Sequence, residues 1–288
     1  MLKIPLATWY SLPIDGRLPE PKICSRCHTQ VEPVPVREIP SSSLVLIEWN
    51  YCDCMQTALR MDHESTRQAE AQEAAHQRFN ERQSLYDRWL PDWRRGPRAD
   101  DQTFATWRRR KGTNNALEQA EDFVARFNEK AKGLLLTGST GTGKTHLLRA
   151  VTHALTAQMV PVLGSDTQHW LARIQETFDQ SGATEADLLR LVRGAPLVVF
   201  DDLGAERDTE WSRDRLLALI EIRYDVMRPV LVSTNYDLDA LRKRLGPRIT
   251  SRLIEMCRMQ KIAASDFRHM CSPAREDIVV PSEVSHAH

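Results

Sequence analysis

Short apolar runs alternate with amphipathic segments through the second half of the chain. Runs at 134–137, 197–200 and 230–233 are almost wholly apolar, which is typical of strands buried on both faces of a sheet. A further run, VPVLG, precedes two segments with the apolar period of amphipathic helices, HWLARIQETF and ADLLRLVRG. Strands that alternate with helices in this way predict an α/β domain whose parallel sheet has helices on both faces.

The first half of the chain has a different pattern. Residues 61–90 are rich in Ala, Glu, Gln and Arg and contain no Gly or Pro, so they predict a helix. Its apolar stripe is thin, which favours an exposed connecting helix over a core element. Upstream, β-branched and Pro-rich sequence between two pairs of cysteines predicts a ribbon hairpin.

The stretch GSTGTGKT follows the first apolar run and matches the phosphate-loop pattern G-x-x-x-x-G-K-[ST]. Its glycines permit the tight curl that turns backbone N–H groups inward, and a helix opening near Lys144 adds a favourable dipole for an anion. Lys144 would reach the β- and γ-phosphates of ATP, and Thr145 would offer its hydroxyl to Mg²⁺. The expected ATP-binding residues are Gly138, Ser139, Thr140, Gly141, Thr142, Gly143, Lys144, Thr145 and His146.

Polar side chains end the next two apolar runs. Asp201 and Asp202 follow the run at 197–200, the form of a Walker B element, where Asp201 would hold Mg²⁺ and Asp202 would orient or activate the attacking water. Asn235 follows the run at 230–233 and can reach the γ-phosphate or its water, although a turn-forming Asn fits the local sequence equally well. The order of loop, carboxylates and amide favours a catalytic set that contains Lys144, Asp201, Asp202 and Asn235.

Composition limits the possible partners and the compartment. The 39 basic and 39 acidic residues cancel, so any nucleic-acid surface is local. No apolar run approaches the ~20 residues that span a membrane, and the N-terminus lacks the apolar core of a signal peptide. We therefore expect a cytoplasmic protein without a membrane partner, whose six cysteines are thiols or metal ligands.

The segment 133–256 resembles the DnaC/DnaI-type replicative helicase loaders and the related IstB transposition helpers, within the initiator-like AAA+ ATPases. The motifs that carry the resemblance are GLLLTGSTGTGKTHLLRA, LVVFDDLGAE, EIRY at 221–224, LVSTNYDLDAL and RLGPRITSRLIEM. The resemblance implies a DNA-associated ATPase that works with a DnaB-type replicative helicase and single-stranded DNA, and that self-associates through its ATP site. Arg252 matches the family's arginine finger, which reaches a neighbouring subunit's γ-phosphate, and Arg248 and Arg223 are weaker candidates.

Few residues follow this segment. About thirty residues after Met256 are too few for a three-helix lid, so we expect no full C-terminal lid, as in the family. Arg268, in SDFRHM, is a candidate for a last strand or turn near the nucleotide. The residues from 272 onward predict a flexible tail.

Four cysteines near the N-terminus have the spacing of a metal site. Cys24-x₂-Cys27 and Cys52-x-Cys54 supply two close pairs of thiolates, which suit a structural, tetrahedral Zn²⁺. His28 is a less favourable alternative ligand because it adjoins Cys27. The module resembles the N-terminal domain of DnaI-type loaders, and the remaining two cysteines, Cys257 and Cys271, are expected to be plain thiols.

Two regions are candidates for contact with single-stranded DNA. Basic and aromatic residues alternate at 88–111, where the aromatic rings either stack on bases or, in the case of Phe104 and Trp107, pack against the ATPase core or adenine. The two amphipathic segments after VPVLG lie where initiator-like proteins carry an inserted helix facing the channel of the assembly. Their candidate DNA contacts, against the alternative of solvated helix faces, are Arg173, Arg190 and Arg193.

These observations predict four parts: a zinc-binding module at 1–60, a helical linker at 61–95, an AAA+ ATPase domain at 96–271 and a flexible tail at 272–288. The function they favour is ATP-dependent loading or remodelling of the replicative helicase, with slow hydrolysis that depends on assembly. The alternatives are an IstB-like transposition helper and a non-catalytic ATP-binding adaptor. Intact Lys144, Asp201 and Arg252 oppose the last of these.

Overall fold

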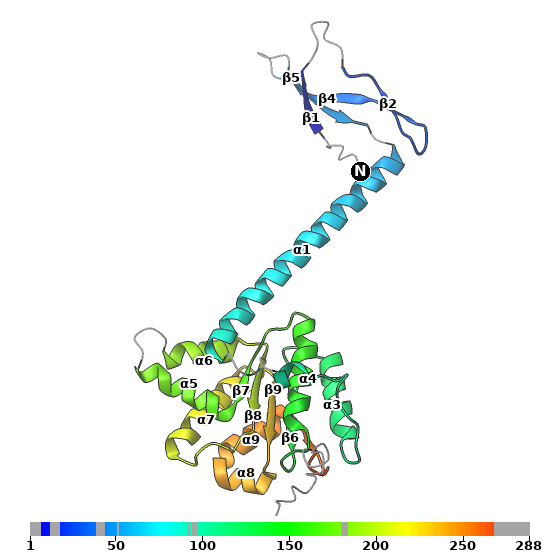
Figure 1. Cartoon of the computed structure of the whole chain (residues 1–288). Coiled ribbons are helices and arrows are strands. Elements are labelled where there is room, and N and C mark those ends of the chain that lie inside the picture. The colour runs from blue at the N-terminus through cyan, green and yellow to red at the C-terminus, as the bar shows by residue number, and fades with distance from the viewer. Residues whose placement is uncertain are drawn as a thin grey trace, which may run out of the picture. The chain divides into compact units, whose positions relative to one another are not determined.

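A computed structural model describes residues 7–11, 18–38, 44–50, 52–90, 93, 97–179 and 184–267 (Figure 1). The chain forms two compact units, Met1–Ala75 and His76–His288, and helix α1 (Asp53–Trp89) belongs to both. The predicted tail at 272–288, Arg268 and Cys271 lie outside the described residues. The expected absence of a full C-terminal lid therefore stays a prediction. Among the described helices, none is long and apolar enough to cross a membrane.

The first unit is built from short antiparallel strands. Its three-stranded sheet has the order β1 (Ala7–Ser11), β5 (Leu44–Trp49), β4 (Pro33–Glu38), and a second sheet pairs β2 (Lys22–Ile23) with β3 (Gln30–Val31). The predicted hairpin between the cysteine pairs is confirmed as β4 and β5. Helix α1 begins at Asp53, earlier than the sequence pattern predicts, which places Cys54 in its first turn.

The second unit contains a five-stranded parallel sheet of order β10-β6-β9-β8-β7. Its strands are β6 (Gly133–Thr137), β7 (Val162–Asp166), β8 (Leu197–Asp201), β9 (Val230–Thr234) and β10 (Cys257–Lys261). The three central strands β6, β8 and β9 are buried along their whole length, as expected for a parallel sheet covered on both faces. The predicted parallel sheet is thus confirmed.

Helices cover both faces of this sheet (Figure 1). Leu134 and Leu136 pack on one face with α3 (Asn114–Ala125) and α4 (Lys144–Ala157). Leu135 packs on the opposite face, in a second cluster, because successive strand residues point to opposite sides. The helices that contribute to this second cluster are α5 (Thr167–Asp179), α6 (Glu185–Gly194), α7 (Glu210–Asp225), α8 (Leu238–Leu245) and α9 (Pro247–Met256).

The last turns of α1 are part of the core of the second unit. Residues 60–74 are exposed, as the thin apolar stripe predicts, but Tyr86 and Leu90 are buried in the cluster beside α5 to α9. The amide of Gln83 pairs with the backbone of Val162, donating to its carbonyl over 3.1 Å and accepting from its N–H over 2.9 Å. The prediction of a purely connecting helix was therefore wrong for these turns, because the side chains that anchor them are too few to form a long stripe.

Arg223 is a structural residue. Its side chain is fully buried, and its guanidinium donates to the carbonyls of Val192, Ala195 and Pro229 over 2.7–2.8 Å. These bonds connect α7 with the end of α6 and with the residue before β9. The hypothesis that Arg223 is an arginine finger is therefore wrong, because its buried guanidinium cannot reach a neighbouring subunit.

Candidate ATP site

The phosphate loop lies between β6 and α4, as its sequence predicts. Gly138, Gly141 and Gly143 have φ values of 153°, 73° and 103°, a region that glycine adopts without steric cost. The buried hydroxyl of Thr142 donates to the carbonyl of Ser139 over 2.9 Å and closes the loop from within. The loop therefore has the curl that presents its N–H groups to an anion at the start of α4.

Lys144 lies at the centre of the site. Its side chain is 6% exposed, and its Nζ donates to the carbonyls of Gly138 and Ser139, each over 2.8 Å. It also donates to Oδ1 of Asn235 over 2.6 Å. The structure thus brings together the loop lysine and the amide at the tip of β9, two residues that the sequence predicts to share a site.

Asp201, at the end of β8, contacts the hydroxyls of two residues. Thr145 donates to its two carboxylate oxygens over 3.1 and 2.9 Å, and Ser233 donates to one of them over 2.5 Å. Burial raises the pKa of the Asp201 carboxyl, while the bonds from Ser233 and Thr145 oppose this shift. A buried carboxylate beside a loop hydroxyl is the donor set that suits Mg²⁺.

Asp202 is held beside Asn235 by its backbone and its side chain. Its φ of 54° lies in the left-handed region, and its N–H donates to the hydroxyl of Ser233 over 2.9 Å. Nδ2 of Asn235 donates to Oδ1 of Asp202 over 2.5 Å. Ser233 thus contacts both aspartates, a role that sequence reasoning missed although it is a polar residue within an apolar run.

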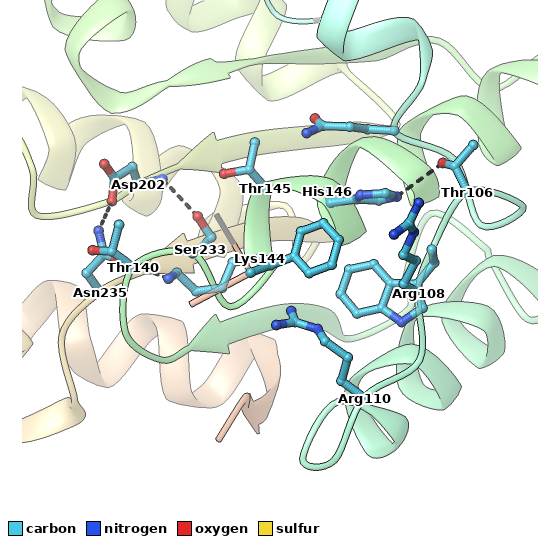
Figure 2. Close-up of a pocket in the computed structure, with 15 residues that line it drawn as sticks. Thr106, Arg108, Arg110, Thr140, Lys144, Thr145, His146, Asp202, Ser233 and Asn235 are labelled. Atoms are coloured by element: carbon cyan, nitrogen blue, oxygen red, sulfur yellow. Dashed lines mark hydrogen bonds between the residues drawn. The ribbon is translucent and has the colours of Figure 1, made fainter. Parts of the chain in front are cut away.

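A cavity of about 280 Å³ opens over these groups (Figure 2). Thr140, Lys144, Asp202 and Asn235 line one end of it, and Figure 2 shows Thr106, Arg108 and His146 at the other. Trp107 and Phe267 also line the cavity. The combination of phosphate-loop residues and aromatic rings in its lining suits a nucleotide.

The described aromatic residues of the stretch at 88–111 pack on the ATPase core, whereas Arg88, Arg108, Arg109 and Lys111 are exposed. Trp93 is buried, and Phe104 and Trp107 pack against the cluster beside α3 and α4. The rings of His146 and Trp107 form a T-shaped pair with centroids 5.0 Å apart, and burial lowers the pKa of the imidazole. The structure therefore supports the packing alternative for these aromatic rings over base stacking.

Both arginines of α9 contact the EIRY residues of α7. The guanidinium of Arg252 lies 3.8 Å from the ring centroid of Tyr224, whose hydroxyl donates to Glu255 over 2.9 Å. Arg248 is paired with Glu221 over 2.6 Å. Neither arginine lines the described ATP-site cavity of its own chain.

The candidate DNA contacts differ in their surroundings. Arg173 is paired with Glu176 over 2.6 Å and lies over the ring of Trp89, so it is largely occupied within the chain. Arg190, on α6, is 75% exposed and paired with Asp187, and Arg193, in the last turn of the same helix, is exposed. Of these three candidates, the two α6 side chains are thus the more exposed to a ligand outside the chain.

The four N-terminal cysteines converge. Their Sγ atoms all lie within 4.8 Å of one another, and Cys54 is 3.3–3.4 Å from the sulfurs of each of the other three. A hydrogen bond with Thr29 lowers the pKa of the Cys27 thiol to about 6, whereas bonds with neighbouring thiols, Cys52 first, raise that of Cys54. Four sulfurs this close fit a tetrahedral dication, and His28, with φ 55°, is not part of the cluster.

Known proteins resemble the second unit in sequence. The replicative helicase loader DnaC of Escherichia coli (strain K12) is 27% identical over 143 residues, which are 50% of this chain and 58% of that protein. The replicative helicase loader DnaI of Bacillus subtilis (strain 168) is 28% identical over 129 residues, 44% of this chain and 41% of that protein. The chain thus spans about half the length of the curated relatives it matches.

Solved structures share the fold. A crystal structure of the DnaC helicase loader has 30% sequence identity and a TM-score of 0.54, and the match covers 58% of this chain and 99% of that one. DnaA from Aquifex aeolicus, bound to AMPPCP, has 18% identity and a TM-score of 0.51, over 58% of this chain and 50% of that one, a likeness of fold alone. The predicted AAA+ core is confirmed.

The family model described as IstB-like ATP binding protein matches residues 115–270, more than half of the chain. This range contains the phosphate loop, both aspartates, Asn235 and Arg252. The chain is a member of the IstB-like ATP-binding family, and the curated relatives described above are named replicative helicase loaders DnaC and DnaI.

Proposed function

We propose that this chain is an ATP-dependent replication factor that loads or remodels a DnaB-type replicative helicase on single-stranded DNA. The observation that carries the proposal is the contact series from Lys144 through Asn235 to Asp202, which joins the phosphate loop to a candidate catalytic carboxylate. The curated relatives that share this part of the chain are named replicative helicase loaders. ATP binding and hydrolysis would serve as the assembly switch.

Each residue of the site has a distinct role in this proposal. Lys144 and the loop N–H groups bind the phosphates, and Thr145 and Asp201 would hold Mg²⁺, which neutralises charge on the phosphate oxygens when bound. Asp202 orients the attacking water or accepts its proton. Asn235 exchanges its bond with Lys144 for one with the γ-phosphate, so it distinguishes ATP from ADP.

Hydrolysis in this proposal depends on a second subunit. Arg252 is on the surface of α9 against Tyr224, outside the cavity of its own chain, and is offered to the nucleotide of a neighbour. A guanidinium supplied in trans stabilises the charge of phosphoryl transfer. Self-association on DNA would therefore switch hydrolysis on, and the exposed α6 arginines Arg190 and Arg193 are the DNA contacts that remain available.

The first unit would bind the helicase. Its four cysteine sulfurs would hold one structural Zn²⁺, which takes the place of a hydrophobic core in so small a unit. Helix α1 is exposed over residues 60–74 and offers a further surface. Helicase contact through this unit leaves the ATP site free to respond to DNA and to a neighbouring subunit.

The proposal is tested by capture and turnover with the full chain. The purified chain is mixed with the replicative helicase and, separately, with a transposase of the same organism, each with ATP and single-stranded DNA. We expect helicase capture and DNA-stimulated hydrolysis. Capture of the transposase alone would establish the IstB-like transposition helper instead, and ATP binding without turnover under every condition would establish the non-catalytic adaptor.

A further inference from the structure

The residues after β10 form a strap over the phosphate loop. The N–H of Ile262 donates to the carbonyl of Thr137 over 2.7 Å, and the N–H of Phe267 donates to the carbonyl of Gly141 over 3.0 Å. A Cβ at Gly141 would lie 1.7 Å from a carboxylate oxygen of Asp266. The strap, residues 262–267, is therefore packed directly on the loop, at a glycine that leaves room for it.

Arg110 fastens the strap to the loop. Its Nη1 donates to the carbonyl of Ser265 over 2.8 Å, and its Nη2 donates to the carbonyl of Thr142 over 3.0 Å. Its guanidinium also lies 4.9 Å from the ring centroid of Phe267, and that of Arg108 lies 5.8 Å from it. One side chain thus joins three segments that are distant in sequence and fixes the position of the Phe267 ring.

The cavity has two chemically different ends. The end that contains Lys144, Asp202 and Asn235 matches phosphate, and the end near Thr106, Arg108 and His146 in Figure 2 lies next to the ring of Trp107. Phe267 lines the same cavity. A nucleotide in this cavity whose phosphates occupy the loop would place its ribose and base toward the aromatic end, because the cavity extends from the loop in that direction.

We propose that Phe267, positioned by Arg110, packs against the base and ribose of the bound nucleotide. The inference deepens the proposed function, since it rests on ATP being the ligand of the loop. An aromatic ring backed by a guanidinium is a stacking surface for any purine, whatever the number of phosphates. Phe267 therefore adds affinity for ATP and ADP alike, whereas Lys144 and Asn235 respond to the phosphates.

The test compares ATP and ADP with inorganic tripolyphosphate, which has the phosphates without base or ribose. Equilibrium binding to the full chain is measured for Phe267→Ala, the conservative Phe267→Tyr, and Phe178→Ala, a control at an exposed phenylalanine on α5. We expect Phe267→Ala to weaken ATP and ADP about tenfold and to leave tripolyphosphate unchanged. Phe267→Tyr and the control should both match the wild type.

Arg110→Gln provides an independent measurement. Loss of the Arg110 hydrogen bonds to Ser265 and Thr142 should weaken the affinity for ATP and ADP by a smaller factor than Phe267→Ala does. The affinity for tripolyphosphate should again stay unchanged. An equal loss for all three ligands would show that the strap only supports the loop, and would overturn the inference. Unchanged ATP affinity in Phe267→Ala would overturn it as well while leaving the proposed function intact, whereas a wild-type chain that binds neither ATP nor tripolyphosphate contradicts both.

Discussion

Lys144 and Asn235 are 91 residues apart in sequence, yet Nζ of the lysine donates to Oδ1 of the amide over 2.6 Å. The other end of the same amide donates to Asp202. Asn235 thus joins the lysine of the phosphate loop to the carboxylate that follows β8. In the proposed function a γ-phosphate would compete with Asn235 for Lys144, so nucleotide binding would be coupled to the orientation of Asp202.

Lys144→Ala should abolish tight ATP binding without unfolding the chain. A charge-assisted bond to phosphate is worth about 2–3 kcal/mol, so affinity should fall by a factor of about 30–150. Titration calorimetry gives the affinity, and far-ultraviolet circular dichroism checks the fold. Lys130→Ala, at an exposed lysine before β6, is the matched control, and an affinity equal to that of the wild type in Lys144→Ala would contradict the assignment.

Asn235→Ala should separate binding from hydrolysis. The amide joins Lys144 to Asp202 but is not the main phosphate ligand, so ATP affinity should change by less than about tenfold while single-turnover hydrolysis falls by about 100-fold or more. Rapid-quench assays on DNA measure the chemical step. Parallel losses in affinity and rate would mean instead that Asn235 only supports the loop.

Arg252→Ala should bind ATP normally and lose DNA-stimulated hydrolysis by about 10³-fold if, as proposed, the finger acts on a neighbour's nucleotide. Mixing Arg252→Ala with Lys144→Ala gives a direct test of action in trans. At an interface between the two variants, the Lys144→Ala subunit still supplies Arg252 to the intact phosphate loop of the Arg252→Ala subunit. Partial recovery of activity in the mixture is the expected outcome, and an inactive mixture would argue for action within one chain.

The matched control for this experiment is Arg248→Ala, four residues earlier on the same helix. Arg248 is 69% exposed and paired with Glu221, so its loss removes a surface ion pair worth at most about 1 kcal/mol. Turnover close to that of the wild type is expected. A loss as large as that of Arg252→Ala would move the finger assignment to Arg248.

Cys24→Ser should lower the zinc content of the purified chain below one ion per molecule. Four sulfurs within 4.8 Å of one another are close enough to share one ion, and a serine hydroxyl is a far weaker zinc ligand than a thiolate. Elemental analysis measures the metal, and Cys257→Ala, which changes a buried cysteine on β10, is the control that should keep it. Full zinc content in Cys24→Ser and no effect of chelation would exclude the cysteine site.

Arg223→Ala should destabilise the second unit by about 3 kcal/mol or more. The change leaves buried carbonyls on Val192, Ala195 and Pro229 without their donor, and it creates a cavity in the core. Denaturant unfolding provides the measurement. The exposed Arg193 is the control, and its replacement by Ala should alter the free energy of unfolding by less than about 0.5 kcal/mol.

The sequence by itself determined the phosphate loop, the three central strands and the acidic and amide residues at the strand ends. These features are local, because each is recognised within a few positions of the sequence. They are the fixed spacing of the loop, the apolar runs and the polar residue after each run. The parallel sheet then follows, because connected strands that alternate with helices place their carboxyl ends at one edge. Lys144, Asp201 and Asn235 meet there for that reason.

Only the tertiary structure decided which side chains face the site and which are buried elsewhere. Ser233 reaches Asp201 because of the register between β8 and β9. Arg223 is buried, although the next residue of the same motif, Tyr224, packs against Arg252. Arg110 meets Ser265 across 155 residues of sequence, a contact that no local period encodes. Such contacts depend on side-chain direction and on chain closure over long separations, which are set when the whole core packs together.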